Sequence, residues 1–274
     1  MRIQHNIMAM NSYRNYNNNT SALSKNLEKL SSGYKINRAG DDAAGLAISE
    51  KMRAQITGLN KAQDNANDGI SLIQTAEGAL TEVHDMLNRM VELAMQSANG
   101  TYEEFDREQL QKEVEQLTAE IDRISESANF NGMKLFNGDL ATTALTLQIG
   151  DAPSDQLGFT LGNMGAASLG IATNSMSIET AASANEAISL VKAAINSVSD
   201  VRGMLGAMQN RLEHTVNNLS VMEENIQNAE SRIRDTDVAE EMMSYVKNNI
   251  LIQSAQAMLA QANQVPQGVL QLLQ

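Results

Sequence analysis

Residues 188–233 read ISLVKAAINSVSDVRGMLGAMQNRLEHTVNNLSVMEENIQNAESRI. Apolar side chains recur in this stretch at spacings of three and four, and Arg202 alone interrupts the pattern. The pattern comprises Ile188, Val191, Ile195, Val198, Leu205, Met208, Leu212, Val216, Leu219, Met222, Ile226, Ala229 and Ile233. Such spacing predicts a helix with a narrow coiled-coil seam. At about 1.5 Å per residue it would be roughly 70 Å long, which predicts an elongated bundle and not a globule.

Two further helices follow from the same periodicity. Residues 42–99 keep the seam with one gap at Glu77, and residues 110–124 repeat it. Between them, Asn99-Gly100 predicts a left-handed cap on the first helix. Thr101 with Glu104 predicts a capping box on the second. The two helices are therefore expected to be antiparallel and joined by a tight loop.

The pattern changes between about residues 131 and 180, where glycine becomes frequent. Alternating segments such as LTLQI at 145–149 predict β-hairpins. The fold class expected is thus mainly α, an elongated helical bundle or coiled coil with a small β-hairpin insert. The predicted domains are residues 1–42 plus 235–274, and residues 43–234 with the insert at about 131–180.

The two ends of the chain are predicted to pair with each other as helices. After Met243, Lys247 is the only charged side chain, so this tail needs a partner surface in water. Isolated terminal helices are marginal, so each is expected to order on meeting a partner. The apolar residues expected to serve this pairing and polymerisation are Leu23, Leu27 and Leu30 at one end, with Ile250, Met258, Leu259, Val265, Val269, Leu272 and Leu273 at the other.

Composition argues against several classes of function. The net charge of −13 disfavours a nucleic-acid binder, although residues 1–60 hold eight basic residues against four acidic ones. The chain has no cysteine, and no apolar run of about 18 residues that predicts membrane insertion. The N-terminus lacks the apolar stretch of a secretory signal, so composition alone would favour the cytoplasm.

No candidate for catalysis or for a metal or cofactor site emerges. His84 and His214 are expected on exposed flanks of the seams, and no HExxH pattern occurs. Asp41-Asp42 precedes a helical pattern and is interpreted as an N-cap. The charged run at residues 103–108 is interpreted as a solvated helix start. No phosphate-binding glycine loop and no GxSxG elbow is present, so the chain is expected not to be an enzyme.

Several stretches resemble bacterial flagellin. They are MRIQHNI at 1–7, LEKLSSGYKINRAGDDAAGLAI at 27–48, ELAMQSAN at 92–99, FNG at 130–132 and AQANQVPQ at 260–267. The likeness covers roughly residues 1–140 and 180–274, with the motifs in the family's order. The final Gln274 departs from the arginine in which many relatives end.

The resemblance implies a structural subunit that polymerises into the extracellular flagellar filament for motility, in a short form without outer variable domains. It implies secretion through the flagellar type III export channel, and partners among the export chaperone, cap and hook-associated proteins. It also implies innate immune recognition by the vertebrate Toll-like receptor for flagellin through Arg89, Leu93 and Glu113. The alternatives are a hook–filament junction protein, a flagellin with catalysis in its insert, and a cytoplasmic coiled-coil adaptor.

Overall fold

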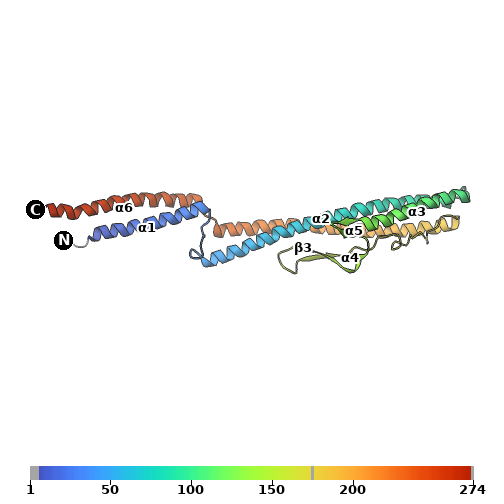
Figure 1. Ribbon diagram of the computed structural model, residues 1–274, viewed down its shortest axis with the longest axis horizontal. Helices are drawn as coiled ribbons and strands as arrows, with labels where there is room; N and C mark the ends of the chain where they lie inside the picture. Colours follow the sequence, from blue (N-terminus) through green and yellow to red (C-terminus); the bar gives the residue numbers. More distant parts are fainter. Residues whose placement is uncertain (1–5, 174–175, 273–274) are drawn as a thin grey trace. The chain divides into compact units, whose positions relative to one another are not determined.

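The computed structural model describes residues 6–173 and 176–272, and this part of the chain is mainly helical, as the sequence predicts (Figure 1). Two small antiparallel hairpins interrupt the helices. The helices are α1 (Ile7–Ser32), α2 (Ala43–Ala98), α3 (Glu104–Ser127), α4 (Asp139–Thr142), α5 (Ala181–Arg234) and α6 (Val238–Leu272). The strands are β1 (Asn129–Phe130), β2 (Met133–Lys134), β3 (Leu145–Gln148) and β4 (Gln156–Phe159).

The chain divides into two compact units. Unit 1 comprises Met1–Ile56 and Glu224–Gln274, and unit 2 comprises Thr57–Glu223. The long helices α2 and α5 each contribute residues to both units. The domain boundaries expected from the sequence, near residues 42 and 235, fall at helix ends, whereas the units divide within α2 and α5.

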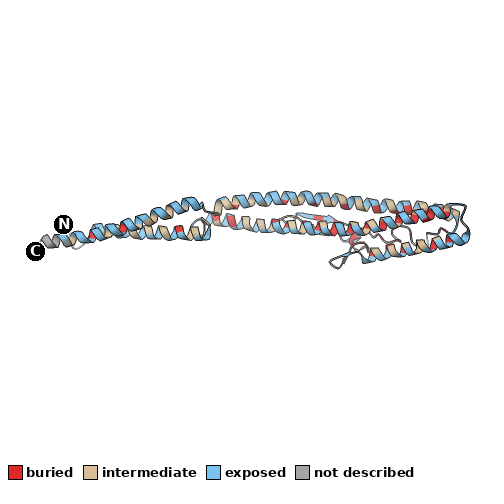
Figure 2. Cartoon of the chain, turned by 90° about the horizontal axis from the view of Figure 1, so that it is seen from above, coloured by how far each residue is buried: buried red, intermediate tan, exposed pale blue. Residues whose placement is uncertain are grey.

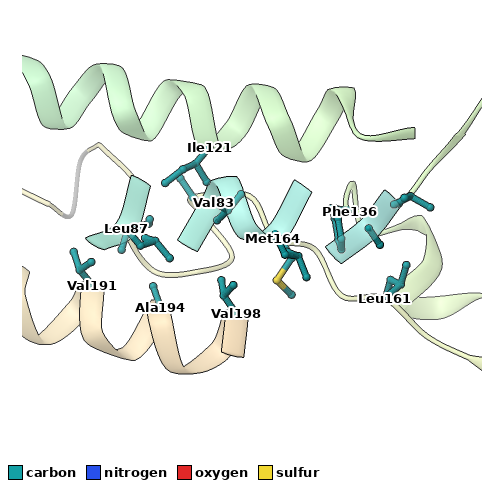
Figure 3. Packing of buried hydrophobic residues seen from close by; sticks show 14 of the residues in the cluster. Val83, Leu87, Ile121, Phe136, Leu161, Met164, Val191, Ala194 and Val198 are labelled. Carbon is teal, nitrogen blue, oxygen red and sulfur yellow. The ribbon is translucent and has the colours of Figure 1, made fainter. Parts of the chain in front are cut away.

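The core of unit 2 lies between α2, α3, α5 and the insert. Figure 3 shows Val83 and Leu87 of α2 between Ile121 of α3 and Val191 and Val198 of α5, all at most 2% exposed. The predicted seam of α5 is confirmed through this unit, since Leu205 and Leu212 are fully buried. The seam prediction is wrong at Met222, which is 44% exposed.

The insert closes the core at one side of the helices. Phe136, Leu161 and Met164 from its loops join the buried cluster (Figure 3). The predicted strand at 145–149 is β3, which pairs with β4 in antiparallel register. The first hairpin turns through Asn131 and Gly132, whose φ angles of 51° and 81° are those of a tight primed turn.

Helix α2 receives the second hairpin at positions with small side chains. A Cβ atom added at Gly69 would lie 2.5 Å from a methyl group of Leu147, so a larger residue here would force the Leu147 side chain of β3 to move. The Asn65 amide donates a hydrogen bond of 3.0 Å to the carbonyl of Gln148 nearby. The hairpin is therefore fixed to α2 by both packing and a polar contact.

The corner between α2 and α3 differs from the sequence prediction. Gly100 does not adopt a left-handed conformation, and the N-cap of α3 is Glu103 instead of Thr101. Asp106 accepts from the Glu103 N–H, which is a capping contact two residues later than expected. The end of α2 needs no glycine cap because Arg107 of α3 donates hydrogen bonds to its carbonyls, as described below.

In unit 1 the predicted pairing of the terminal helices is confirmed: α1 packs along α6. The Asn6 amide donates to the carbonyl of Ala262 at 2.7 Å, and Lys29 forms a 3.6 Å ion pair with Glu241. These two contacts make the helices antiparallel. No helix within the described residues is long and apolar enough to cross a membrane.

Candidate functional site

The most deeply buried residues of the contact between α1 and α6 are small or polar. Its buried residues are Asn26 on α1 and Ala255 and Ala262 on α6. Small residues let two helices approach closely but bury little apolar area. Figure 2 shows the consequence, because red residues are sparse along both terminal helices and blue ones dominate. The pair therefore leaves most of its apolar surface in water.

The residues predicted to serve pairing are unevenly buried. Leu23, Leu30 and Leu259 are half-buried. Leu27 is 48% exposed in the monomer, whereas the neighbouring Asn26 is buried. Exposed as well are Ile250 (56%), Met258 (62%) and Val265 (45%), while the side chains of Val269, Leu272 and Leu273 lie outside the described ones.

An exposed apolar surface on α6 surrounds a shallow groove of about 570 Å³. We call it the α6 apolar face, and it consists of Met242, Met243, Val246, Ile250 and Leu251. Met243 is 68% exposed, and Lys247 is the one charged residue that lines the groove. Contiguous apolar surface of this kind in a water-exposed helix marks a site of interaction with another protein or with a second copy.

A cluster around Tyr34 joins the segment after α1 to charged residues of α2 and α5 in unit 1. The Tyr34 ring lies between two guanidinium groups, 5.4 Å from Arg53 and 4.9 Å from Arg234. The Tyr34 hydroxyl accepts a 2.9 Å hydrogen bond from Arg53, which also pairs with Glu230 at 3.3 Å. Arg234 in turn forms an ion pair with Glu50.

Backbone contacts join the segment between α1 and α2 to the segment between α5 and α6 at the same place. Tyr34 forms a β-bridge with Asp235, the Lys35 N–H donates to the carbonyl of Arg234 at 2.6 Å, and the Thr236 N–H donates to Gly33. This cluster could not be predicted from a local sequence pattern, because its members are separated by up to two hundred residues.

Arg107 is the second functional side chain that sequence reasoning missed. It was interpreted as part of a solvated run, yet it is only 8% exposed. Its guanidinium donates to the carbonyls of Ser97 (2.6 Å), Asn99 (3.1 Å) and Tyr102 (3.0 Å). A cation from α3 thus satisfies the free carbonyls at the C-terminal end of α2, in place of a glycine cap.

Arg89 and Glu113 meet across α2 and α3. The Arg89 guanidinium donates to Glu113 and to Glu92, each at 2.9 Å. These hydrogen bonds, the one to Glu113 foremost, raise the pKa of Arg89 above its ordinary value. Leu93, the third residue implied by the resemblance, is 1% exposed and lies in the core. The exposed part of this set is therefore the ion pair without Leu93.

The histidines and acidic residues do not form a metal centre within the described residues, where no group of three potential ligands occurs. His214 is exposed as expected. The expectation for His84 is wrong, since its ring is half-buried and its Nδ1 is enclosed without a hydrogen-bond partner. The Asp42 carboxylate accepts from the N–H groups of Ala44 and Gly45, which confirms its interpretation as an N-cap.

The chain is similar to known protein families and to individual proteins along most of its length. Residues 3–141 match the model of the bacterial flagellin N-terminal helical region, and residues 188–273 match that of the C-terminal helical region. The chain is 52% identical to flagellin of Bacillus subtilis (strain 168) over 303 aligned positions that cover both proteins completely. It is 49% identical to the flagellar filament 33 kDa core protein of Treponema phagedenis, again with complete coverage of both.

One solved structure shares the fold at low identity. A putative flagellar hook-associated protein from Vibrio parahaemolyticus superposes with a TM-score of 0.60 over 71% of this chain and 100% of that one, at 14% identity. At that identity the likeness concerns the fold alone. The family models, by contrast, match most of the sequence, and the relatives match along the entire chain. This chain belongs to the bacterial flagellin family.

Proposed function

We propose that this chain is the structural subunit of a flagellar filament used for motility, and that it polymerises through its paired terminal helices. The observation that carries the proposal is the α6 apolar face, which α1 leaves uncovered. Burying a side chain such as methionine or isoleucine completely contributes about 1.5–3 kcal/mol. Contact with neighbouring copies would bury several such side chains per subunit.

The test is a substitution in the middle of the α6 apolar face. Ile250→Asp should prevent polymerisation, because a buried carboxylate without a partner opposes association. Gln256→Asp is the matched control, since it adds the same charge at another exposed position of α6. Purified monomers would be seeded and the pelleted fraction measured after ultracentrifugation. Equal pelleting of Ile250→Asp and wild type would contradict the proposed contact.

The proposal places the mature protein outside the cell, after secretion through the flagellar export channel. Its partners would include an export chaperone, cap proteins and hook-associated proteins. The complete coverage of flagellins and of a filament core protein favours a filament subunit over a hook–filament junction protein. Quantitative mass spectrometry of sheared extracellular filaments distinguishes them: a filament subunit is the bulk component, whereas a junction protein is a trace component.

A second proposed function is recognition of the monomer by the vertebrate Toll-like receptor for flagellin. The observation in its favour is the exposed ion pair of Arg89 and Glu113, which displays a fixed pair of charges from two adjacent helices. Leu93 lies on α2, like Arg89, but is buried in the core. It would act indirectly, because its packing holds Arg89 in position. Titration of immobilised receptor with monomer tests the proposal, as detailed in the Discussion.

A further inference from the structure

Unit 1 contains a groove of about 770 Å³ with basic walls and an apolar floor. Its free cations are Lys25, Lys35 and Arg232, and we call it the basic groove. Its apolar residues are Ile36, Ile48 and Ile233, of which Ile48 is 48% exposed. The volume lies within the usual range of ligand pockets.

The carboxylates that line the basic groove are already engaged. Asp41 accepts from the backbone N–H of Arg38, and Asp42 accepts from the first turn of α2. Lys29, also in the wall, is paired with Glu241. No carboxylate of residues 6–173 or 176–272 lies within ion-pairing distance of the three free cations. The lining of the groove holds four basic side chains and two carboxylates, a formal excess of two positive charges in a chain whose net charge is −13.

Unit 2 displays a feature of opposite charge at the start of α3. Residues 103–106, which we call the acidic knob, have the sequence Glu-Glu-Phe-Asp. Phe105 is 68% exposed, an unusual position for an aromatic ring, and Glu103 and Glu104 are exposed on either side of the N-cap. No cation of the described residues lies within ion-pairing distance of these two glutamates.

The acidic knob is held in place from below. The buried Arg107 follows it directly and is fixed by its three hydrogen bonds to the end of α2. Asp106 closes the turn onto the Glu103 N–H. The knob therefore loses little conformational freedom when it binds, and an interface formed by such a preorganised segment is stronger than one formed by a flexible loop.

We infer that the acidic knob of one copy inserts into the basic groove of a second copy. Phe105 would lie on the isoleucine floor, and Glu103 and Glu104 would face the three lysine and arginine side chains. Every copy carries both the acidic knob and the basic groove, and their opposite charges favour a second copy as the occupant. This inference rests on the proposed polymerisation and names a contact beyond the terminal helices.

The arrangement explains why association would continue beyond a dimer. The knob and the groove are different surfaces, so their contact is heterologous, and a pair of copies retains a free groove on one copy and a free knob on the other. A heterologous contact that does not close on itself generates an open helical polymer. The opposite charges would also accelerate encounter and select the register of the contact.

Complementary charge reversal tests the inference with the full-length chain. The knob variant is Glu103→Lys with Glu104→Lys, and the groove variant is Lys25→Glu with Lys35→Glu. Each alone should raise the critical concentration for polymerisation by about tenfold or more at low salt. An equimolar mixture should polymerise, because each reversed surface then finds an oppositely charged partner on the other variant.

Controls separate this contact from general charge effects and from misfolding. Glu126→Lys with Glu179→Lys, and Lys134→Glu with Lys192→Glu, change the same number of charges at exposed positions elsewhere and should polymerise like wild type. Circular dichroism checks the fold of each variant. Phe105→Ala, which leaves all charges in place, should also raise the critical concentration.

The outcomes distinguish the inference from the proposed function. If wild type polymerises and the reversed variants do so equally well, the knob-to-groove contact is wrong while the filament proposal stands. A mixture that polymerises no better than either variant alone also overturns the contact. If wild type itself fails to polymerise while correctly folded, both the inference and the proposed function are overturned.

Discussion

Glu77 and Arg202, the two residues that interrupt the apolar seams of α2 and α5, form an ion pair with each other across unit 2. The distance between Glu77 Oε1 and Arg202 Nη2 is 3.6 Å, and both side chains are half-exposed. Arg202 Nε is enclosed and has no hydrogen-bond partner among the described residues. The charged residue that interrupts the seam of α2 thus lies opposite the charged residue that interrupts the seam of α5. Their ion pair favours this register of the two helices.

The first prediction concerns this pair. Glu77→Ala should destabilise the monomer by about 1 kcal/mol, because Arg202 keeps its charge in a partly enclosed seam without its carboxylate. The double variant Glu77→Leu with Arg202→Leu should be at least as stable as wild type, since both gaps become apolar. Urea unfolding of all the variants in a double-mutant cycle measures the coupling. Additive effects would show that the pair contributes nothing.

The second prediction concerns Arg107, whose buried guanidinium donates three hydrogen bonds. We therefore expect a larger loss of stability than for Glu77→Ala. Arg107→Ala removes three hydrogen bonds to the carbonyls of Ser97, Asn99 and Tyr102, of which the Asn99 carbonyl keeps a second, longer bond from the Tyr102 N–H. A loss of about 2–4 kcal/mol in the free energy of unfolding is expected. Arg123→Ala, which removes an exposed pair with Glu120, should change the urea midpoint little. Equal midpoints for the two variants would mean that the end of α2 does not depend on Arg107.

Helix positions were predictable because their signal is local. The spacing of apolar residues along α2 and α5 follows directly from helical geometry, and the glycine-rich insert marked the hairpins. The Asp42 cap was predictable for the same reason. The Thr101 capping box failed because Glu103 and Asp106 offered the same chemistry two residues later, and the local sequence does not decide between them.

The contacts that depend on distant parts of the chain were not predictable. Arg107 is buried only because the end of α2 supplies carbonyls for it, and Tyr34 lies between two arginines contributed by different helices. Leu93 was named only through the resemblance, and its position also depends on distant parts of the chain. It lies about 40° around α2 from Arg89 and is 1% exposed, because other elements cover that side of the helix.

The third prediction uses two positions of the same sequence pattern. Leu212→Asp should unfold unit 2 of the monomer, because an unpaired carboxylate in a fully buried site costs several kcal/mol, a large share of a domain's stability. Met222→Asp, at a position that the pattern also assigned to the seam, should leave the melting temperature of the monomer nearly unchanged because Met222 is exposed. Thermal circular dichroism compares them. A normal melting temperature for Leu212→Asp would contradict the described core.

The fourth prediction separates contact from support in receptor binding. Arg89→Ala and Glu113→Ala should weaken the affinity of the monomer for the Toll-like receptor by about tenfold, while the melting temperature stays close to that of wild type. Leu93→Ala should instead lower the stability by about 2–5 kcal/mol, since it opens a cavity in the core. Arg123→Ala is the control for loss of an exposed ion pair on the neighbouring face. Unchanged affinity in both charge variants would show that the resemblance does not extend to recognition.

The last prediction concerns the terminal pair as a whole. A chain that ends after residue 236 lacks α6 and should not polymerise, because α1 loses its helical partner and neighbouring copies lose the α6 apolar face. Unit 2 should still melt as in the full chain, since its core draws no residue from α6. Residues 6–32 should lose helix content, because an isolated helix of this length is marginal in water. Sedimentation after seeding measures polymerisation, and circular dichroism measures the helix content and the melting of unit 2. A truncated chain that still forms filaments would show that the terminal helices are not the main contact, whereas loss of unit 2 melting would show that the two units do not fold independently.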